Sequence, residues 1–188
     1  MEEGFKVPIQ VLHDFVERIK RLRIPYMLSG STAMIYYSVY RFTADIDIVL
    51  ELSERDAGRI IGILEPFYYV PHDAVRRAIS ANRMFNVVHM QTAYKVDCII
   101  KKTTEFQVNA FERRREVEFN GADISIITLE DLIISKLLWA KDSKSDTQFK
   151  DIRNLLKVDC DRDYLDRWVS KLGLEETLEL SIEVGEDE

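Results

Sequence analysis

The sequence predicts an α/β (α+β) protein, with a mixed sheet and flanking helices over residues 1–127 and a helical region over residues 128–188. Up to residue 127, short runs of β-branched and other apolar residues alternate with segments of helical apolar period. After that point only the helical period continues. The chain has 188 residues, 46% hydrophobic and 31% charged, so it is long enough to bury a sizeable core.

The first part of the chain supplies the predicted sheet. Residues 9–22 have apolar side chains at helical spacing, and Pro25 ends that helix. Further helices are predicted at 33–40, 54–67 and 104–114, strands at 26–28, 45–52, 84–90 and 94–102, and a hairpin at 115–128. The hairpin is centred on Asn120-Gly121, a pair typical of tight turns between strands.

The second part is predicted to be helical throughout. Thr128 and Asp131 have the capping-box spacing at the start of a helix over 128–141. Three more helices are predicted at 147–158, 162–173 and 174–184. We therefore expect two units, a core over 1–127 and a helical C-terminal region over 128–188 that packs on it.

Charge and composition exclude several classes of protein. The formal net charge of −7 gives no global basic field for nucleic acid, and the run Arg113-Arg114-Arg115 is interpreted as a solvated helix face. Two distant cysteines, Cys98 and Cys160, argue against a disulfide framework or a thiolate metal site. No secretory signal precedes the first helix, and no apolar run approaches the roughly 20 residues of a membrane span. The expected location is the cytoplasm, with no membrane partner.

Asp45 and Asp47 interrupt an otherwise apolar strand. Residues two apart in a strand point to the same face, so the two carboxylates project together, roughly 7 Å apart at the backbone. Two carboxylates at this distance repel each other, and a divalent cation such as Mg²⁺ removes that penalty. The alternative is that both acids lie on a solvated face of the sheet.

Asp97 is a candidate third carboxylate. It lies in the apolar strand predicted at 94–102, and it joins the other two acids if this strand pairs beside theirs. Three acids on adjacent strands can hold the metal ions used for in-line phosphoryl displacement. The third acid is then placed to act as a base on the attacking hydroxyl.

Gly30 and Ser31 lie at a predicted strand-to-helix turn. A glycine there lets the backbone approach a ligand, and the following amides with the Ser31 hydroxyl suit phosphate oxygens. An ordinary capped turn is the alternative. The thirteen residues from Thr32 to Ala44 leave room for one helix and a return loop into the strand of Asp45.

These motifs together resemble the polymerase-β-like nucleotidyltransferase superfamily. The matching residues are Leu28, Gly30-Ser31 and Asp45-Ile46-Asp47-Ile48, and Arg41-x-Thr43 before the acids is similar to small bacterial members. The C-terminal half, with Lys136 and Lys150-Asp151, resembles the abortive-infection (AbiEii-like) group, which includes toxins of toxin–antitoxin pairs. It departs from that group at residues 141–146 and at Asn154.

The resemblance implies a metal-dependent nucleotidyltransferase with a nucleotidyltransferase-fold sheet. Such an enzyme moves a nucleoside monophosphate from an NTP to an acceptor and releases pyrophosphate. Mg²⁺ (or Mn²⁺) would be held by Asp45, Asp47 and Asp97, with Asp97 also activating the nucleophile. The nucleotide would be bound by Gly30, Ser31, Thr43, Lys136 and Asp151.

Lys136 leaves alternatives open, because its predicted helix is apolar nearly all round. A lysine in such a helix must extend its head to solvent, pair with an acid or reach into a cleft. Asp151 is either the residue that positions it or an acid on a helix face.

Two other functions are compatible with the sequence. One is a nucleotide-binding module that has lost turnover, and the other is an interaction protein, such as one half of a toxin–antitoxin pair with a cognate antitoxin. For an active enzyme, the acceptor is an RNA end, a protein hydroxyl or a small molecule such as an aminoglycoside.

Overall fold

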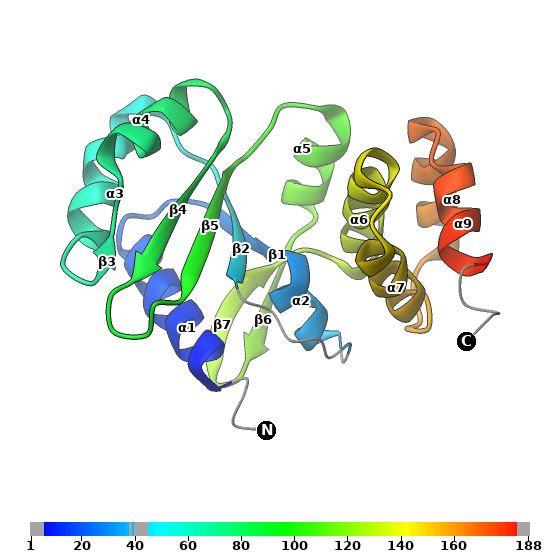
Figure 1. Cartoon of the computed structure of the whole chain (residues 1–188), viewed down its shortest axis with the longest axis horizontal. Coiled ribbons are helices and arrows are strands. Elements are labelled where there is room, and N and C mark those ends of the chain that lie inside the picture. Colours follow the sequence, from blue (N-terminus) through cyan, green and yellow to red (C-terminus); the bar gives the residue numbers. More distant parts are fainter. Residues whose placement is uncertain (1–5, 38, 40–44, 184–188) are drawn as a thin grey trace.

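The computed structural model describes residues 6–37, 39 and 45–183, and Figure 1 shows their arrangement. One seven-stranded mixed sheet has the strand order β3-β4-β5-β2-β1-β7-β6. The helices α1, α3 and α4 lie on one side of this sheet, α2, α5 and α6 lie on the other, and α7 to α9 extend beyond α6 (Figure 1). This architecture confirms the predicted fold class.

The elements have the following bounds. The strands are β1 (Tyr26–Ser29), β2 (Asp45–Leu50), β3 (Tyr68–Tyr69), β4 (Met84–His89), β5 (Lys95–Ile100), β6 (Arg115–Phe119) and β7 (Ala122–Ile126). The helices are α1 (Lys6–Arg21), α2 (Gly30–Tyr36), the 3-10 turn η2 (Glu54–Asp56), α3 (Ala57–Leu64), α4 (His72–Ser80), α5 (Glu105–Glu112), α6 (Leu129–Ser143), α7 (Asp146–Leu155), α8 (Arg162–Leu172) and α9 (Glu175–Glu183).

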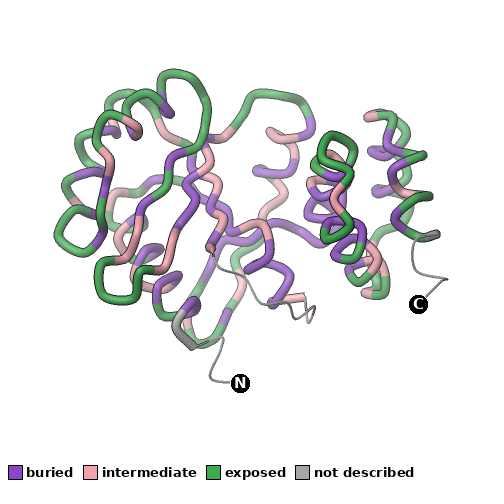
Figure 2. The backbone as a smooth tube through the Cα atoms, viewed as in Figure 1, coloured by how far each residue is buried: buried purple, intermediate pink, exposed green. Residues whose placement is uncertain are grey.

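The centre of the sheet is β2, which pairs antiparallel with β1 and parallel with β5. On one face of β2, Ile46, Ile48 and Leu50 are fully buried. Figure 2 shows this buried core along the central strands, with exposed residues gathered in the outer loops. The acidic residues Asp45 and Asp47 alternate with these isoleucines and therefore lie on the opposite face.

Most predicted elements are present, with shifted ends. The hairpin of β6 and β7 is confirmed, and both turn residues, Asn120 and Gly121, have the positive φ that a tight turn between strands requires. Helix α2 begins at Gly30, three residues before its predicted start. Sequence analysis missed β3, which has two residues, and α4, whose apolar face is only Val75, Ala78 and Ile79.

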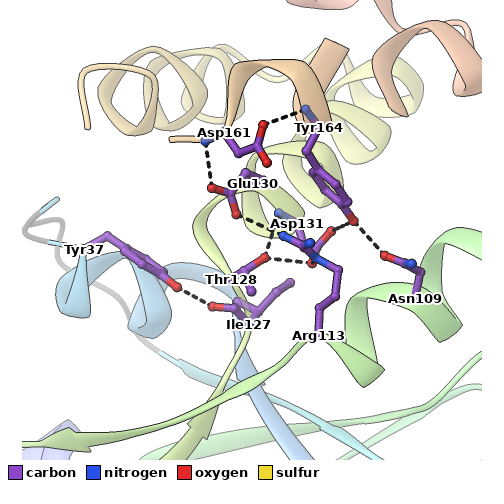
Figure 3. A network of polar contacts seen from close by, with 9 residues as sticks. All are labelled: Tyr37, Asn109, Arg113, Ile127, Thr128, Glu130, Asp131, Asp161 and Tyr164. Atoms are coloured by element: carbon purple, nitrogen blue, oxygen red, sulfur yellow. Dashed lines mark hydrogen bonds and ion pairs between the residues drawn. The ribbon is translucent and has the colours of Figure 1, made fainter. Parts of the chain in front are cut away.

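A polar network joins the C-terminal helices to the core (Figure 3). The carboxylate of Asp131, fully buried at the start of α6, accepts hydrogen bonds from the Thr128 hydroxyl at 2.7 Å, from Arg113 Nε at 3.2 Å and from the Tyr164 hydroxyl at 2.6 Å. The capping role of Thr128 is confirmed, because its hydroxyl also accepts from the Asp131 amide.

The same network corrects one interpretation. The guanidinium of Arg113 lies 3.8 Å from the centre of the Tyr164 ring and pairs with Asp131, so it does not lie on a solvated helix face. These contacts hold α5, α6 and α8 together. The division of the chain into a core over 1–127 and a helical region over 128–188 stays a prediction. In the described part of the chain, no helix is both long and apolar enough to cross a membrane.

Candidate active site

The parallel pairing of β2 with β5 brings the predicted acids together. Asp47 lies opposite Asp97 in the register, and Asp45 lies opposite Lys95. Because paired residues of neighbouring strands share a face, all four side chains point to the same side of the sheet. Asp97 is buried, at 6% exposure, whereas Asp45 and Asp47 are partly buried.

Lys95 is the site residue that sequence analysis missed. Its ammonium lies 3.2 Å from Oδ2 of Asp45 and 2.9 Å from Oδ2 of Asp97. Asn86 on β4 donates a second hydrogen bond to Asp97, at 3.3 Å. The pKa of Lys95 is raised, chiefly by its hydrogen bond to Asp97. The rule that places Asp45 beside Asp47 also places Lys95 beside Asp97, so the signal was present in the sequence.

Of the three acids, Asp47 has the negative charge that its surroundings offset least. Within the described residues, its carboxylate accepts no hydrogen bond. Its pKa is raised to about 6, first by burial and then by the negative charges of Asp45 and Asp97, while Lys136 and Lys95 oppose the rise. An acid in this state favours either a proton or a cation at neutral pH.

Gly30 is packed directly against Asp47. Its φ of +60° is a conformation that side chains rarely adopt. A Cβ atom at this position would lie 1.9 Å from Oδ2 of Asp47 and 2.8 Å from its Cβ. The glycine is therefore required by the acid as well as by the turn.

A cavity of about 220 Å³ opens beside Asp47. Its polar end is formed by Gly30, Ser31, Asp47 and Lys136, whereas Asp45 and Asp97 do not line it. The rest of the wall combines polar side chains, Lys101, Lys102, Gln107 and Ser135 among them, with apolar ones, which include Met27, Val49, Ile99, Phe106, Ile127, Leu132 and Trp139. Trp139, at the rim, is 60% exposed.

Lys136 pairs with an acid and lines the cavity. Its ammonium donates to Oδ2 of Asp151 at 2.8 Å and to Oε1 of Gln148 at 3.2 Å. Lys136 is 4% exposed and Asp151 is 2% exposed, so the ammonium does not extend to bulk solvent and Asp151 is not an acid on an exposed helix face. Of the predicted nucleotide-binding residues, Thr43 lies outside the described part of the chain, as does Arg41.

The donor set fits a divalent cation in its chemistry. Carboxylate oxygens are the ligands that Mg²⁺ and Mn²⁺ prefer, and the poorly compensated charge of Asp47 favours a cation nearby. The described residues nevertheless contain no group of three or more His, Cys, Asp or Glu side chains already arranged around a metal position. Lys95 lies between two of the three acids.

The fold and the acids on its central strands agree with the class of nucleotidyltransferases. A family model described as "Nucleotidyltransferase of unknown function (DUF6036)" matches residues 9–179. The chain therefore belongs to this family, and the prediction of a nucleotidyltransferase is confirmed. A comparison with curated proteins gave no match.

Several solved structures share the fold. ANT(2″)-Ia in complex with adenylyl-2″-tobramycin is 13% identical, with 88% of this chain and 97% of that chain covered and a TM-score of 0.61. The lincosamide antibiotic adenylyltransferase LnuA, lincomycin-bound, is 16% identical, with 79% and 96% covered and a TM-score of 0.53. An antigenic nucleotidyltransferase-like protein from Paracoccidioides brasiliensis is 14% identical, with 97% and 93% covered and a TM-score of 0.56.

Gly30→Ala should lower the stability of the folded protein by more than the strain of its positive φ accounts for. The added Cβ collides with the carboxylate of Asp47, so either the acid or the start of α2 must shift. Gly121→Ala is the matched control, because Gly121 also has positive φ but has open space around its Cβ position. We expect the free energy of unfolding in urea to fall by about 1–3 kcal/mol more in Gly30→Ala than in Gly121→Ala. Equal losses would show that Gly30 serves the turn alone.

The stability of the metal-free protein should depend on Asp47 and pH. The folded chain protonates Asp47 near pH 6 and the unfolded chain near the ordinary pKa of 3.8, so the folded state binds its proton more tightly. This contribution favours folding below pH 4 and is lost as pH rises to 6. The Asp47→Asn side chain does not ionise, so the variant avoids this loss of stability. It should be roughly 1–3 kcal/mol more stable than wild type at pH 7.

The measurement is urea unfolding in chelator at a series of pH values from 4 to 7. Asp166→Asn, at an exposed position on α8, is the control and should follow the wild-type curve. If the difference in free energy of unfolding between wild type and Asp47→Asn stays constant across this pH range, the raised pKa of Asp47 is contradicted.

Proposed function

We propose that the protein transfers a nucleoside monophosphate from an NTP to a hydroxyl acceptor with the help of a divalent cation. The observation that supports this most is the placement of Asp45, Asp47 and Asp97 on one face of two parallel strands, next to a cavity that a buried lysine also lines. Membership of a nucleotidyltransferase family agrees with this chemistry.

Asp45, Asp47 and Asp97 are the residues that would hold Mg²⁺ or Mn²⁺. The metal, when bound, supplies charge neutralisation for the triphosphate and for the leaving pyrophosphate. The chain itself contributes positioning and electrostatics, since phosphoryl transfer needs little covalent work from a protein. Asp47 is central in this arrangement, because it lies both in the acidic cluster and on the cavity wall.

The NTP is assigned to the cavity. Its polar end, with Gly30, Ser31 and Lys136, suits the β- and γ-phosphates, which carry most of the ligand charge. The apolar wall, with Phe106 and the exposed ring of Trp139, suits the nucleoside. The α-phosphorus would then lie near Asp47, where the two parts of the site meet.

The acceptor is assigned to the other side of Asp47, where Asp45 and Asp97 lie outside the cavity wall. In the reaction the acceptor oxygen attacks the α-phosphorus, the bond to pyrophosphate breaks, and pyrophosphate leaves with the bonding electrons. Asp97 takes the proton of the acceptor hydroxyl. Its hydrogen bond from Asn86 holds the carboxylate in place for this step.

A small hydroxylated molecule is the acceptor class that we favour. The net charge of −7 disfavours a polyanion such as RNA. ANT(2″)-Ia and LnuA, which share the fold, were solved with an adenylylated aminoglycoside and with lincomycin. The resemblance to the abortive-infection group, with its toxin–antitoxin pairs and a cognate antitoxin, stays a prediction, as does cytoplasmic location.

Transfer activity should depend on the metal and on Asp97. Wild-type protein is incubated with each α-labelled NTP, Mg²⁺ or Mn²⁺, and a cell lysate separated into small molecules, RNA and protein. We expect label in the small-molecule fraction, pyrophosphate release, and loss of both in chelator. Asp97→Asn should lose at least about a hundredfold in rate, because the proposed base and one of the proposed metal ligands are removed together.

Asp166→Asn is the control and should retain full activity. Label in RNA or protein would correct the acceptor class. Tight NTP binding without pyrophosphate release under any condition would instead favour a nucleotide-binding module that lacks turnover.

Lys136 should contribute to triphosphate binding beyond its structural role. Lys136→Met alone leaves Asp151 buried without its ammonium, which costs about 3–5 kcal/mol of stability, so the informative variant is Lys136→Met with Asp151→Asn. We expect this double variant to bind NTP about ten- to a hundredfold more weakly, since a charge-assisted contact is lost. Binding of the monophosphate should change less.

Asp151→Asn alone is the matched control, because it keeps the ammonium and the neighbouring Gln148. It should retain most of the NTP affinity. If the double variant and the control bind both nucleotides with wild-type affinity, Lys136 is a structural residue only. Tryptophan fluorescence titration or calorimetry measures the six affinities, those of wild type, the double variant and the control for each of the two nucleotides.

A further inference from the structure

Lys95 brings a positive charge into the acidic site from the same strand as Asp97. The register places it directly opposite Asp45 and two residues before Asp97, so its side chain lies on the face of the acids. Its ammonium contacts Asp45 at 3.2 Å and Asp97 at 2.9 Å. One ammonium thus bridges carboxylates from two neighbouring strands.

The ion pairs of Lys95 join Asp45 and Asp97 and do not include Asp47. Lys95 pairs with Asp45, which precedes Asp47 by two residues on β2, and with Asp97, which lies opposite Asp47 on β5. Among the described residues, Lys95 is thus an internal cation for two of the three carboxylates, Asp45 and Asp97. This bridge offsets part of the repulsion between the acids of β2 and β5 without metal, whereas burial of the opposite, apolar face fixes the register.

The position of Lys95 differs from that of ordinary surface ion pairs. Lys171 pairs with Glu105 far from the acids, and pairs of this kind contribute little. The ammonium of Lys95 instead lies between two of the acids proposed to bind metal. Two cations that share the same carboxylates repel each other strongly at this range. The Lys95 side chain is 38% exposed, so it can turn to solvent without unpacking the core.

We propose that Lys95 is an internal counter-cation, which holds Asp45 and Asp97 in the metal-free protein and withdraws when a divalent cation binds these acids. This inference rests on the proposed function, which assigns the metal to the same carboxylates. Lys95 is a positioning residue in this scheme. It limits repulsion among the acids before metal arrives, and it weakens the affinity of the site for metal alone.

The first test measures Mn²⁺ binding by calorimetry to wild type, Lys95→Met, Lys95→Arg and Lys171→Met. Lys95→Met should bind Mn²⁺ about tenfold more tightly or better, because a positive charge beside the dication is removed. Lys95→Arg keeps the charge and should bind like wild type. Lys171→Met, the matched control, removes a lysine from a pair outside the site and should also bind like wild type.

The second measurement is urea unfolding of the same variants in chelator. Lys95→Met should lose more stability than Lys171→Met, because Asp45 and Asp97 then lose the ammonium that pairs with both of them. Adding Asp45→Asn to Lys95→Met should restore much of that loss. If Lys95→Met unfolds in chelator and refolds when Mn²⁺ is added, the counter-cation role is equally supported.

The outcomes separate this inference from the proposed function. Equal or weaker Mn²⁺ binding by Lys95→Met, with wild type still binding, overturns the inference alone and leaves the metal site in place. Absence of Mn²⁺ binding in both proteins overturns the metal site and the inference together. Mn²⁺ binding by Lys95→Met but not by wild type also overturns the inference, because the lysine then blocks the site and does not withdraw from it.

Discussion

Three carboxylates on one face of two central strands are the constraint on which the rest of the site depends. Asp45, Asp47 and Asp97 are held within one parallel register, where their mutual repulsion opposes the pairing that brings them together. The fold tolerates this because the opposite face of the same strands is fully apolar and buried. Burial of that face fixes the register, and the register leaves the acids no freedom to separate.

The neighbours of Asp47 follow from this constraint. Gly30 has no side chain because the carboxylate occupies the space where a Cβ would lie. The start of α2, and with it Ser31, is thereby brought against the acid, and α6 places Lys136 on the far wall of the same cavity. The network around Asp131 fixes the start of α6 through α5 and α8, so contacts far from the chemistry determine where Lys136 lies (Figure 3).

The sequence predicted the elements that carry strong periodic signals and the acids that interrupt them. The alternation of Asp45 and Asp47 with isoleucines defined both faces of β2, and the Asn120-Gly121 pair located the hairpin. The partners of Lys136 could not be chosen from spacing, because Gln148 and Asp151 come from another helix and meet it only through tertiary packing. Arg113 was misinterpreted for the same reason, since Tyr164 lies far along the chain.

The two lysines of the site differ in a way that matches their proposed roles. Lys136 is buried, at 4% exposure, and is fixed by Asp151 and Gln148, so its charge is a permanent part of the cavity wall. Lys95 is 38% exposed, and its ammonium pairs with Asp45 and Asp97, two acids that are proposed to bind metal, so its charge can be exchanged. A fixed cation suits a substrate group that must always bind in one place, whereas an exchangeable one suits a position that alternates between two cations. This asymmetry agrees with the proposal that the nucleotide binds on the Lys136 side of Asp47 and that metal exchange takes place on the Lys95 side.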